Sequence, residues 1–263
     1  MKRLATAAVL LPLLILFILK ASAFQFSLLV ILLSLLGLEE FYRMALPSRR
    51  GEGRLAAVAG ASALCTIFSG NPVLALLALT ALVLAFCLVA LFRLQEIPKA
   101  AADAALVLMG FLYVPLLLGH LIMIRMLPHG VSWIFLIMVI VMAGDSAAYY
   151  VGSSIGKNRL YPLVSPKKSV EGSIGGLAGS VIGALIAKYT FFPELAVADC
   201  IATALILGVL GQLGDLFESL MKRSCGVKDS GTIVPGHGGI LDRLDSILFA
   251  APAAFYYAYF LFR

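Results

Sequence analysis

The residues from Ser219 to Asp245 combine the side chains that metal and phosphate chemistry needs, in a chain that is otherwise strongly apolar. The stretch reads SLMKRSCGVKDSGTIVPGHGGILDRLD. Its chemically active residues are the cations Lys222, Arg223, Lys228 and Arg243, the acids Asp229, Asp242 and Asp245, and His237, with Gly238 and Gly239 among its glycines. Ionisable groups at membrane depth are costly and usually functional. This combination predicts a site that holds a metal ion and a polyphosphate beside a lipid.

A second polar group lies between residues 143 and 172. Asp145 sits inside an apolar run, and Ser165, Lys167 and Lys168 follow it in a polar segment. Asp145 fits a functional site, but it also fits a packed polar contact between helices. The two lysines fit phosphate binding. Taken alone, they are better explained as the positive charge that membrane proteins carry on their cytoplasmic side.

Two groups of polar residues near the C-terminus have helical spacing. Asp215, Glu218 and Ser219 are three and four residues apart, so they share one helical face. That face could be a solvated helix end, but its apolar neighbours favour a buried and partnered acid. Asp242 and Asp245 also share a face, at the start of the last apolar run. There a glycine-rich turn leaves backbone N–H groups available to phosphate.

Composition indicates that lipid is the solvent for most of this chain. It is 62% apolar and 13% charged, whereas soluble domains are about half apolar and about a quarter charged. Apolar runs of roughly 20 residues predict an all-α, polytopic integral membrane protein with about nine transmembrane helices. The predicted spans are 4–20, 23–42, 55–70, 73–94, 101–126, 132–152, 172–190, 196–220 and 240–262. Spans one to five, in residues 1–130, are predicted to be a scaffold, and residues 131–263 the catalytic region.

The basic residues predict the orientation of these spans. Sixteen of the 20 Lys and Arg residues fall on the side of the N-terminus, which places it in the cytoplasm. The net charge of +6 is therefore a topology signal and does not indicate nucleic acid. Residues 1–23 also resemble a signal peptide, but Lys20 and the long apolar run favour a first span. The four cysteines have no paired spacing, so neither disulfides nor a cysteine-bound zinc is expected.

The depth of four acids suggests which ion they bind. At about 1.5 Å rise per residue, Asp145, Asp215, Asp242 and Asp245 all fall in the cytoplasmic part of the membrane. Four acids at one level require cations, and oxygen-only ligands indicate a hard ion such as Mg²⁺. Mg²⁺ beside Lys and Arg indicates phosphate. His237 alone is weak evidence for a catalytic site, because a loop histidine is more often a structural hydrogen-bonding group than a catalyst.

At these residues the sequence resembles the CTP:phosphatidate cytidylyltransferases. The match includes Lys222-Arg223, Lys228-Asp229, Pro235, His237-Gly238-Gly239 and Asp242-Arg243, and it ends at Asp245 without a departure. The segment from Ser165 to Gly172 and Asp145 are also similar. The resemblance implies a helical, multi-pass homodimer in the cell membrane with its active site on the cytoplasmic side. It implies the transfer of CMP from CTP to phosphatidate, which gives CDP-diacylglycerol and pyrophosphate.

The resemblance also implies roles for the polar residues. Mg²⁺ would be held by Asp215, Asp242 and Asp245, with Asp145 either binding the ion or supporting its ligands. Mn²⁺ could substitute, and an additional monovalent cation is a further option. The expected catalytic residues are Asp215, Asp242, Asp245, Lys222 and Arg223. The expected substrate-binding residues are Ser165, Lys167, Lys168, Lys228, His237, Gly238, Gly239 and Arg243.

Two other functions remain open from the sequence. One is a CTP-dependent transferase or kinase that acts on another lipid, such as a polyprenol or an ether lipid. This function remains open because the sequence does not define the apolar pocket that would bind the lipid. The other is an ion-coupled transporter that uses the acids as an ion path. Transport would favour acids near the middle of the membrane, whereas these are expected near its cytoplasmic face.

Overall fold

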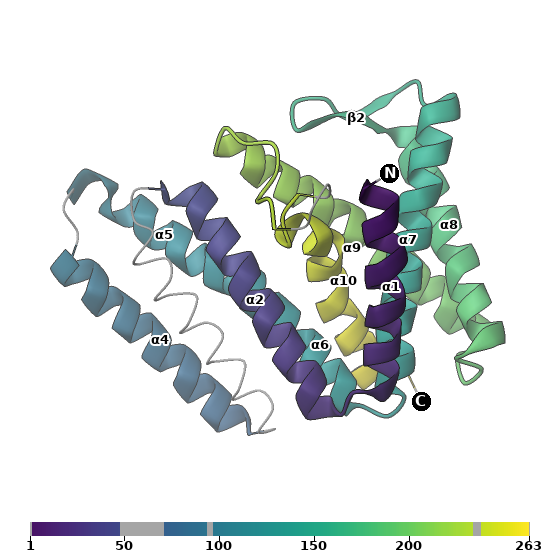
Figure 1. Cartoon of the computed structure of the whole chain (residues 1–263), viewed down its shortest axis with the longest axis horizontal. Coiled ribbons are helices and arrows are strands. Elements are labelled where there is room, and N and C mark those ends of the chain that lie inside the picture. The colour runs from purple at the N-terminus through teal and green to yellow at the C-terminus, as the bar shows by residue number, and fades with distance from the viewer. Residues whose placement is uncertain (1, 48–70, 94–96, 234–237, 263) are drawn as a thin grey trace. The chain divides into compact units, whose positions relative to one another are not determined.

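The computed structural model describes residues 2–47, 71–93, 97–233 and 238–262 (Figure 1). Its long helices are α1 (Lys2–Lys20), α2 (Ala23–Ala45), α4 (Pro72–Arg93), α7 (Gly130–Ile155), α8 (Val170–Thr190), α9 (Val197–Ser224) and α10 (Leu241–Phe260). A continuous helical stretch also forms from η2 (Ile97–Lys99), α5 (Ala100–Phe111), η3 (Leu112–Leu116) and α6 (Leu117–Met126). Helices therefore lie at the predicted spans, except for 55–70, which is outside the described residues.

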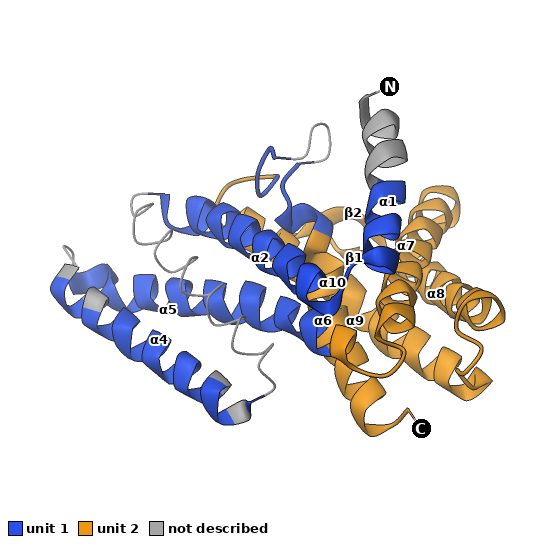
Figure 2. Ribbon diagram, turned by 60° about the horizontal axis from the view of Figure 1, so that its bottom comes forward, with its two compact units in different colours: residues 1–123, 229–243 blue, residues 124–228, 244–263 orange. Residues whose placement is uncertain are grey.

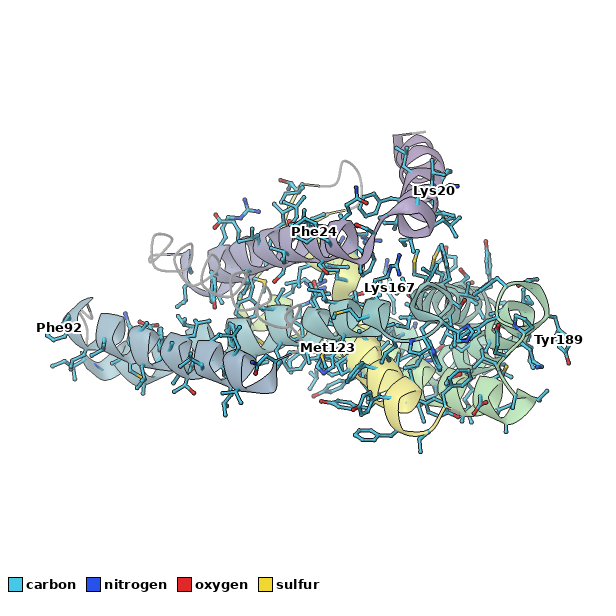
Figure 3. All side chains as sticks on the ribbon, turned by 90° about the horizontal axis from the view of Figure 1, so that it is seen from below. Lys20, Phe24, Phe92, Met123, Lys167 and Tyr189 are labelled. Atoms are coloured by element: carbon cyan, nitrogen blue, oxygen red, sulfur yellow. The ribbon has the colours of Figure 1, made fainter. Side chains whose placement is uncertain are left out.

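The described helices agree with an all-α integral membrane protein. Five helical segments are long and apolar enough to cross a membrane: Ala23–Ala45, Ile97–Met126, Gly130–Ile155, Val170–Thr190 and Val197–Ser224. Large apolar and aromatic side chains stay exposed, as contact with lipid requires. Phe92 at the end of α4 and Tyr189 at the end of α8 point outward (Figure 3). The number of spans and the orientation remain predictions.

The chain forms two compact units (Figure 2). The first contains residues 1–123 and 229–243, and the second contains residues 124–228 and 244–263. The boundary between them falls within α6 and again within α10. Residues 229–243 thus group with the N-terminal helices, whereas the sequence placed them in a C-terminal catalytic region.

In the first unit, α2 packs against α5 and η3. The Tyr42 hydroxyl donates a 2.7 Å hydrogen bond to the Val107 carbonyl oxygen. Gly110 allows this approach, because a Cβ there would lie 2.8 Å from an atom of the Phe41 ring. The helix widens to a π-helix at η3, which contains Pro115. Proline has no N–H to donate, so the ordinary helical pattern cannot continue through it.

In the second unit, α8 packs closely between α7 and α9. A Cβ on Gly179 would lie 2.8 Å from the Ala143 carbonyl oxygen, so only glycine permits this spacing. Small residues of this kind let helices approach closely in lipid. An antiparallel hairpin of β1 (Arg159–Tyr161) and β2 (Ser165–Ser169) connects α7 to α8. The sequence did not predict this hairpin.

Candidate active site

Three acids of the second unit come together on three different helices. Asp245 on α10 lies close enough to Asp215 on α9 and Asp145 on α7 for their charges to interact, and it also interacts with Lys222. The close packing of α9 on α10 depends on Gly214, where a Cβ would lie 2.5 Å from the Asp245 carbonyl oxygen. These three residues, which spacing and depth predict to lie at one level together with Asp242, therefore form one ionic cluster.

Lys168 reaches this cluster from the hairpin. Its Nζ lies 2.5 Å from Asp215 Oδ2, and both side chains are about 30% exposed. The Ser219 hydroxyl donates to Asp215 Oδ1 at 3.4 Å. Of the two candidate lysines in the hairpin, Lys168 is the one that contacts a predicted site acid, while Lys167 is exposed.

The base of the hairpin is fixed by Glu171 on the first turn of α8. Its carboxylate accepts hydrogen bonds from the backbone N–H groups of Lys157 and Asn158, at 3.1 and 3.2 Å. The Asn158 side-chain amide adds a third bond at 2.7 Å. The Ser169 hydroxyl caps α8 by accepting from Gly172 N at 3.1 Å. Together these hydrogen bonds fix the backbone position of Lys168.

Lys222 faces the interior of the second unit. Its Nζ lies 3.2 Å from Glu218 Oε1, one helical turn earlier on α9, and Glu218 is fully buried. Arg223 next to it is exposed, and its guanidinium donates to the Val227 carbonyl oxygen at 3.1 Å. The structure thus separates two neighbouring candidate cations, and Lys222 is the one at the acid cluster.

Asp242 occupies a different environment from Asp245, although both belong to α10. It lies in the first unit and is 8% exposed. Its Oδ2 accepts hydrogen bonds from the backbone N–H groups of Ser230 at 3.0 Å and Gly239 at 2.8 Å. Gly238 has a φ of +86°, which favours glycine, and it passes close to the same carboxylate. In this structure Asp242 organises the preceding loop.

The other predicted site residues lie around these groups. Ser165 is half-buried in β2, whereas Lys228 and Arg243 are exposed. His237 lies outside the described residues, so its predicted role has no structural counterpart here. No three Asp, Glu, His or Cys side chains in the described part of the chain form a metal-binding group.

The carboxylate chemistry nevertheless fits a magnesium ion. Asp145, Asp215, Asp245 and Glu218 offer oxygen ligands, and Lys168 and Lys222 lie beside them. Mg²⁺ typically takes one or two carboxylates together with substrate phosphates and water, so it needs no cage of three protein acids.

One acid of the first unit was missed by the sequence reasoning. Glu40 on α2 is 1% exposed, and its Oε2 accepts a 2.9 Å hydrogen bond from Leu241 N at the start of α10. The available signal was an acidic pair, Glu39-Glu40, inside the predicted span 23–42. It was attributed to the polar end of a scaffold helix.

The fold defines a helical membrane protein with a cluster of acids and lysines in its second unit, and comparison with known proteins identifies its family. A family model described as the cytidylyltransferase family matches residues 1–261. The chain belongs to this family.

Three named relatives are similar to part of this chain. The chain is 41% identical over 155 residues to the phosphatidate cytidylyltransferase of Bacillus subtilis (strain 168), which covers 59% of this chain and 58% of that protein. It is 45% identical over 150 residues to the enzyme of that name from Staphylococcus aureus (strain COL), and 42% over 150 residues to that from Staphylococcus haemolyticus (strain JCSC1435). Each of these covers 57% of both chains, so the matched part is less than two thirds of the relatives' length.

Proposed function

We propose that this protein is a phosphatidate cytidylyltransferase, which joins CTP to phosphatidate and releases pyrophosphate. The observation that carries the proposal is the ionic cluster of the second unit, where Asp145, Asp215 and Asp245 on three apolar helices lie near Lys168 and Lys222. Relatives that share 41% and 45% identity carry the name of this activity. A lipid phosphate and a nucleotide could both reach charges placed in this way.

The proposed reaction is a substitution at phosphorus. A phosphate oxygen of phosphatidate attacks the α-phosphorus of CTP and forms a new P–O bond. The bond from the α-phosphorus to the bridging oxygen breaks, and pyrophosphate leaves with the electron pair. Phosphatidate is already ionised at neutral pH, so no general base is required. Catalysis then consists of positioning the two anions and offsetting their charge.

The lysines of the cluster would bind phosphate oxygens. Lys168 and Lys222 each already face a carboxylate, and we propose that they exchange this partner for a phosphate oxygen when CTP binds. Mg²⁺, or Mn²⁺ in its place, would be held by Asp215 and Asp245, with Asp145 as a ligand or as support for one. The bound ion would neutralise phosphate charge as it develops during the reaction. Arg223, Lys228 and an additional monovalent cation remain further candidates for this site. Asp242 and Arg243, in the first unit, remain candidates for binding metal and substrate.

We also propose the finer topology. Nine spans with a cytoplasmic N-terminus would place the hairpin and the acid cluster on the cytoplasmic side of the cell membrane, where CTP is found. A homodimer is proposed from the family resemblance. Exposed apolar side chains along α4, such as Val73, Leu84 and Phe92, could face either lipid or a second copy.

A comparison of lipid acceptors tests the substrate assignment. The purified protein would receive labelled CTP and Mg²⁺ with phosphatidate, a polyprenol, a polyprenyl phosphate or an unsaturated ether-lipid phosphate, and the labelled lipids would be separated. The proposal expects CDP-diacylglycerol from phosphatidate at a rate at least about tenfold above any other acceptor, which corresponds to about 1.4 kcal/mol of discrimination. Preferred labelling of another lipid would instead identify the second candidate, a related CTP-dependent enzyme.

A further inference from the structure

Glu40 lies in an environment that a lipid-facing scaffold helix does not require. It sits on α2, in a segment apolar enough to cross a membrane, and is 1% exposed. An ionisable side chain at such a position suggests a function with an identifiable partner. The partners of Glu40 come from a segment about 190 residues later in the chain, at the start of α10.

Two hydrogen bonds converge on one oxygen of Glu40. The backbone N–H of Leu241 donates to Oε2 at 2.9 Å, and the Ser230 hydroxyl donates to the same atom at 3.2 Å. Ser230 is 4% exposed and Leu241 is fully buried, so water cannot easily replace Glu40 as the acceptor. Leaving a buried N–H without an acceptor is costly.

The backbone of the segment closes tightly around this carboxylate. A Cβ on Gly231 or on Gly239 would collide with the oxygen atoms of Glu40. A side chain at either position would therefore require the Glu40 carboxylate to move, so the two glycines let the chain approach Glu40 from two sides. The glycines flanking this segment thus serve a structural contact as well as any contact with phosphate.

The same segment is also held by Asp242. Its Oδ2 accepts from Ser230 N and Gly239 N. Glu40 therefore binds Ser230 through the hydroxyl while Asp242 binds it through the backbone. The two acids hold both ends of the segment between Ser230 and Leu241.

We propose that Glu40 is a positioning residue, which fixes Ser230 and Leu241 so that Asp242 and the start of α10 are correctly placed for turnover. It acts through the hydrogen bonds that its Oε2 accepts and not through its charge. Its effect on turnover rests on the proposed function, whereas its effect on the segment does not. No part of this role requires Glu40 to touch a substrate or a metal ion.

Two conservative variants separate hydrogen bonding from charge. Glu40→Gln removes the charge but keeps an oxygen at the same reach, and one oxygen suffices because both bonds go to Oε2. Glu40→Asp keeps the charge but withdraws the acceptor by one methylene. Glu40→Ala removes both. Ser34→Ala is the matched control, since Ser34 is a buried polar residue on the same helix.

Hydrogen exchange of the purified, full-length protein measures the positioning directly. The proposal expects peptides that carry Ser230 and Leu241 to exchange at least about fivefold faster in Glu40→Ala and Glu40→Asp, the order expected when a buried hydrogen bond is lost. Glu40→Gln and Ser34→Ala should exchange like the parent protein. If Glu40→Ala does not accumulate, the comparison of Asp with Gln decides the question.

Turnover provides the second readout. With CTP and phosphatidate, kcat should fall by about tenfold in Glu40→Ala and Glu40→Asp, with a smaller change in KM, because a misplaced group slows the chemical step. Glu40→Gln should stay within about twofold of the parent.

Two results would overturn the proposal: unchanged exchange in Glu40→Ala and Glu40→Asp, or a Gln variant that is more impaired than the Asp variant. If the parent protein forms no CDP-diacylglycerol, the proposed function fails, and the exchange result alone then decides the role of Glu40.

Discussion

At the scale of single residues, the ionic cluster of the second unit contains more acids than lysines. Asp145, Asp215 and Asp245 interact, and Glu218 lies one turn from Asp215 on the same helix. Lys168 and Lys222 offset two of these charges. Like charges at short range repel strongly where water is scarce. Such an arrangement costs stability, and the proposed metal ion and phosphates would offset this repulsion when bound.

Replacing either of two acids should therefore affect turnover more than folding. Asp215→Asn and Asp245→Asn keep the shape of the side chain and remove one negative charge. We expect kcat to fall by about 10²-fold or more, the order found when one electrostatic stabiliser is lost. Both variants should insert and purify normally, because a charge is removed from a repulsive cluster. Steady-state assays at saturating Mg²⁺ measure the effect.

Glu194→Gln is the control for this pair. Glu194 belongs to the same unit but lies in the connection from α8 to α9, at the helix ends away from the hairpin, where it contacts His129 at 3.7 Å. Its replacement should leave kcat unchanged. Near-normal turnover in both Asp variants would refute the site assignment, and failure of both to accumulate would show that the acids are structural.

At the scale of elements, the site depends on how closely α9 approaches α10. A Cβ on Gly214 would lie 2.5 Å from the Asp245 carbonyl oxygen, which is backbone and cannot turn aside. One turn earlier, a Cβ on Gly211 would meet Ser246 Cβ at 3.6 Å, an ordinary contact. The two glycines therefore differ in the space available, although they lie on the same helix and face the same neighbour.

Alanine at these two positions should have opposite effects. Gly214→Ala should destabilise the protein by about 1–3 kcal/mol, the usual cost of overpacking, and should lower turnover by displacing Asp245. Gly211→Ala should be neutral or stabilising by up to about 1 kcal/mol, because alanine favours helix over glycine. Thermal unfolding in detergent, followed by helical circular dichroism, compares them. Equal tolerance of both substitutions would show that the helices are not closely packed at Gly214.

The sequence predicted the elements of this structure better than their contacts. Apolar runs gave helix positions because lipid imposes a length of about 20 residues on each span. The hairpin at 159–169 escaped prediction because its strands have three and five residues, too few for a recognisable pattern. The π-helix at η3 was also missed, although Pro115 within an apolar run indicated an irregularity.

The candidate site was predicted in part. Spacing and depth indicated that Asp145, Asp215 and Asp245 are neighbours. Each prediction required only the position of the residue along its own helix. The pair of Lys168 and Asp215 joins residues 47 apart, and no local pattern reveals such a contact. The role of Glu40 required the fold for the same reason, because its partners lie near the other end of the chain.

At the scale of the whole molecule, the central prediction is which side of the membrane carries the hairpin. Leu163 lies in the hairpin turn and is 86% exposed, so a cysteine there is accessible to a reagent. Glu194→Cys provides the matched position on the predicted opposite side. In a background without the four native cysteines, an impermeant thiol reagent applied to intact cells should label Glu194→Cys and not Leu163→Cys.

Inverted membrane vesicles should reverse this pattern. Leu163→Cys should then react and Glu194→Cys should not. Labelling of Leu163→Cys from outside the cell would place the site away from cytoplasmic CTP and contradict the proposed topology.

The central claim is that the protein transfers the CMP group of CTP to phosphatidate in a reaction that depends on a divalent cation. The most direct measurement supplies the purified protein with phosphatidate and either α- or γ-labelled CTP, with Mg²⁺ or after exhaustive chelation. The account predicts that the α label enters CDP-diacylglycerol, that the γ label is recovered only in pyrophosphate, and that chelation abolishes both until Mg²⁺ or Mn²⁺ is restored. Transfer of the γ label to lipid, or full activity after chelation, would contradict it.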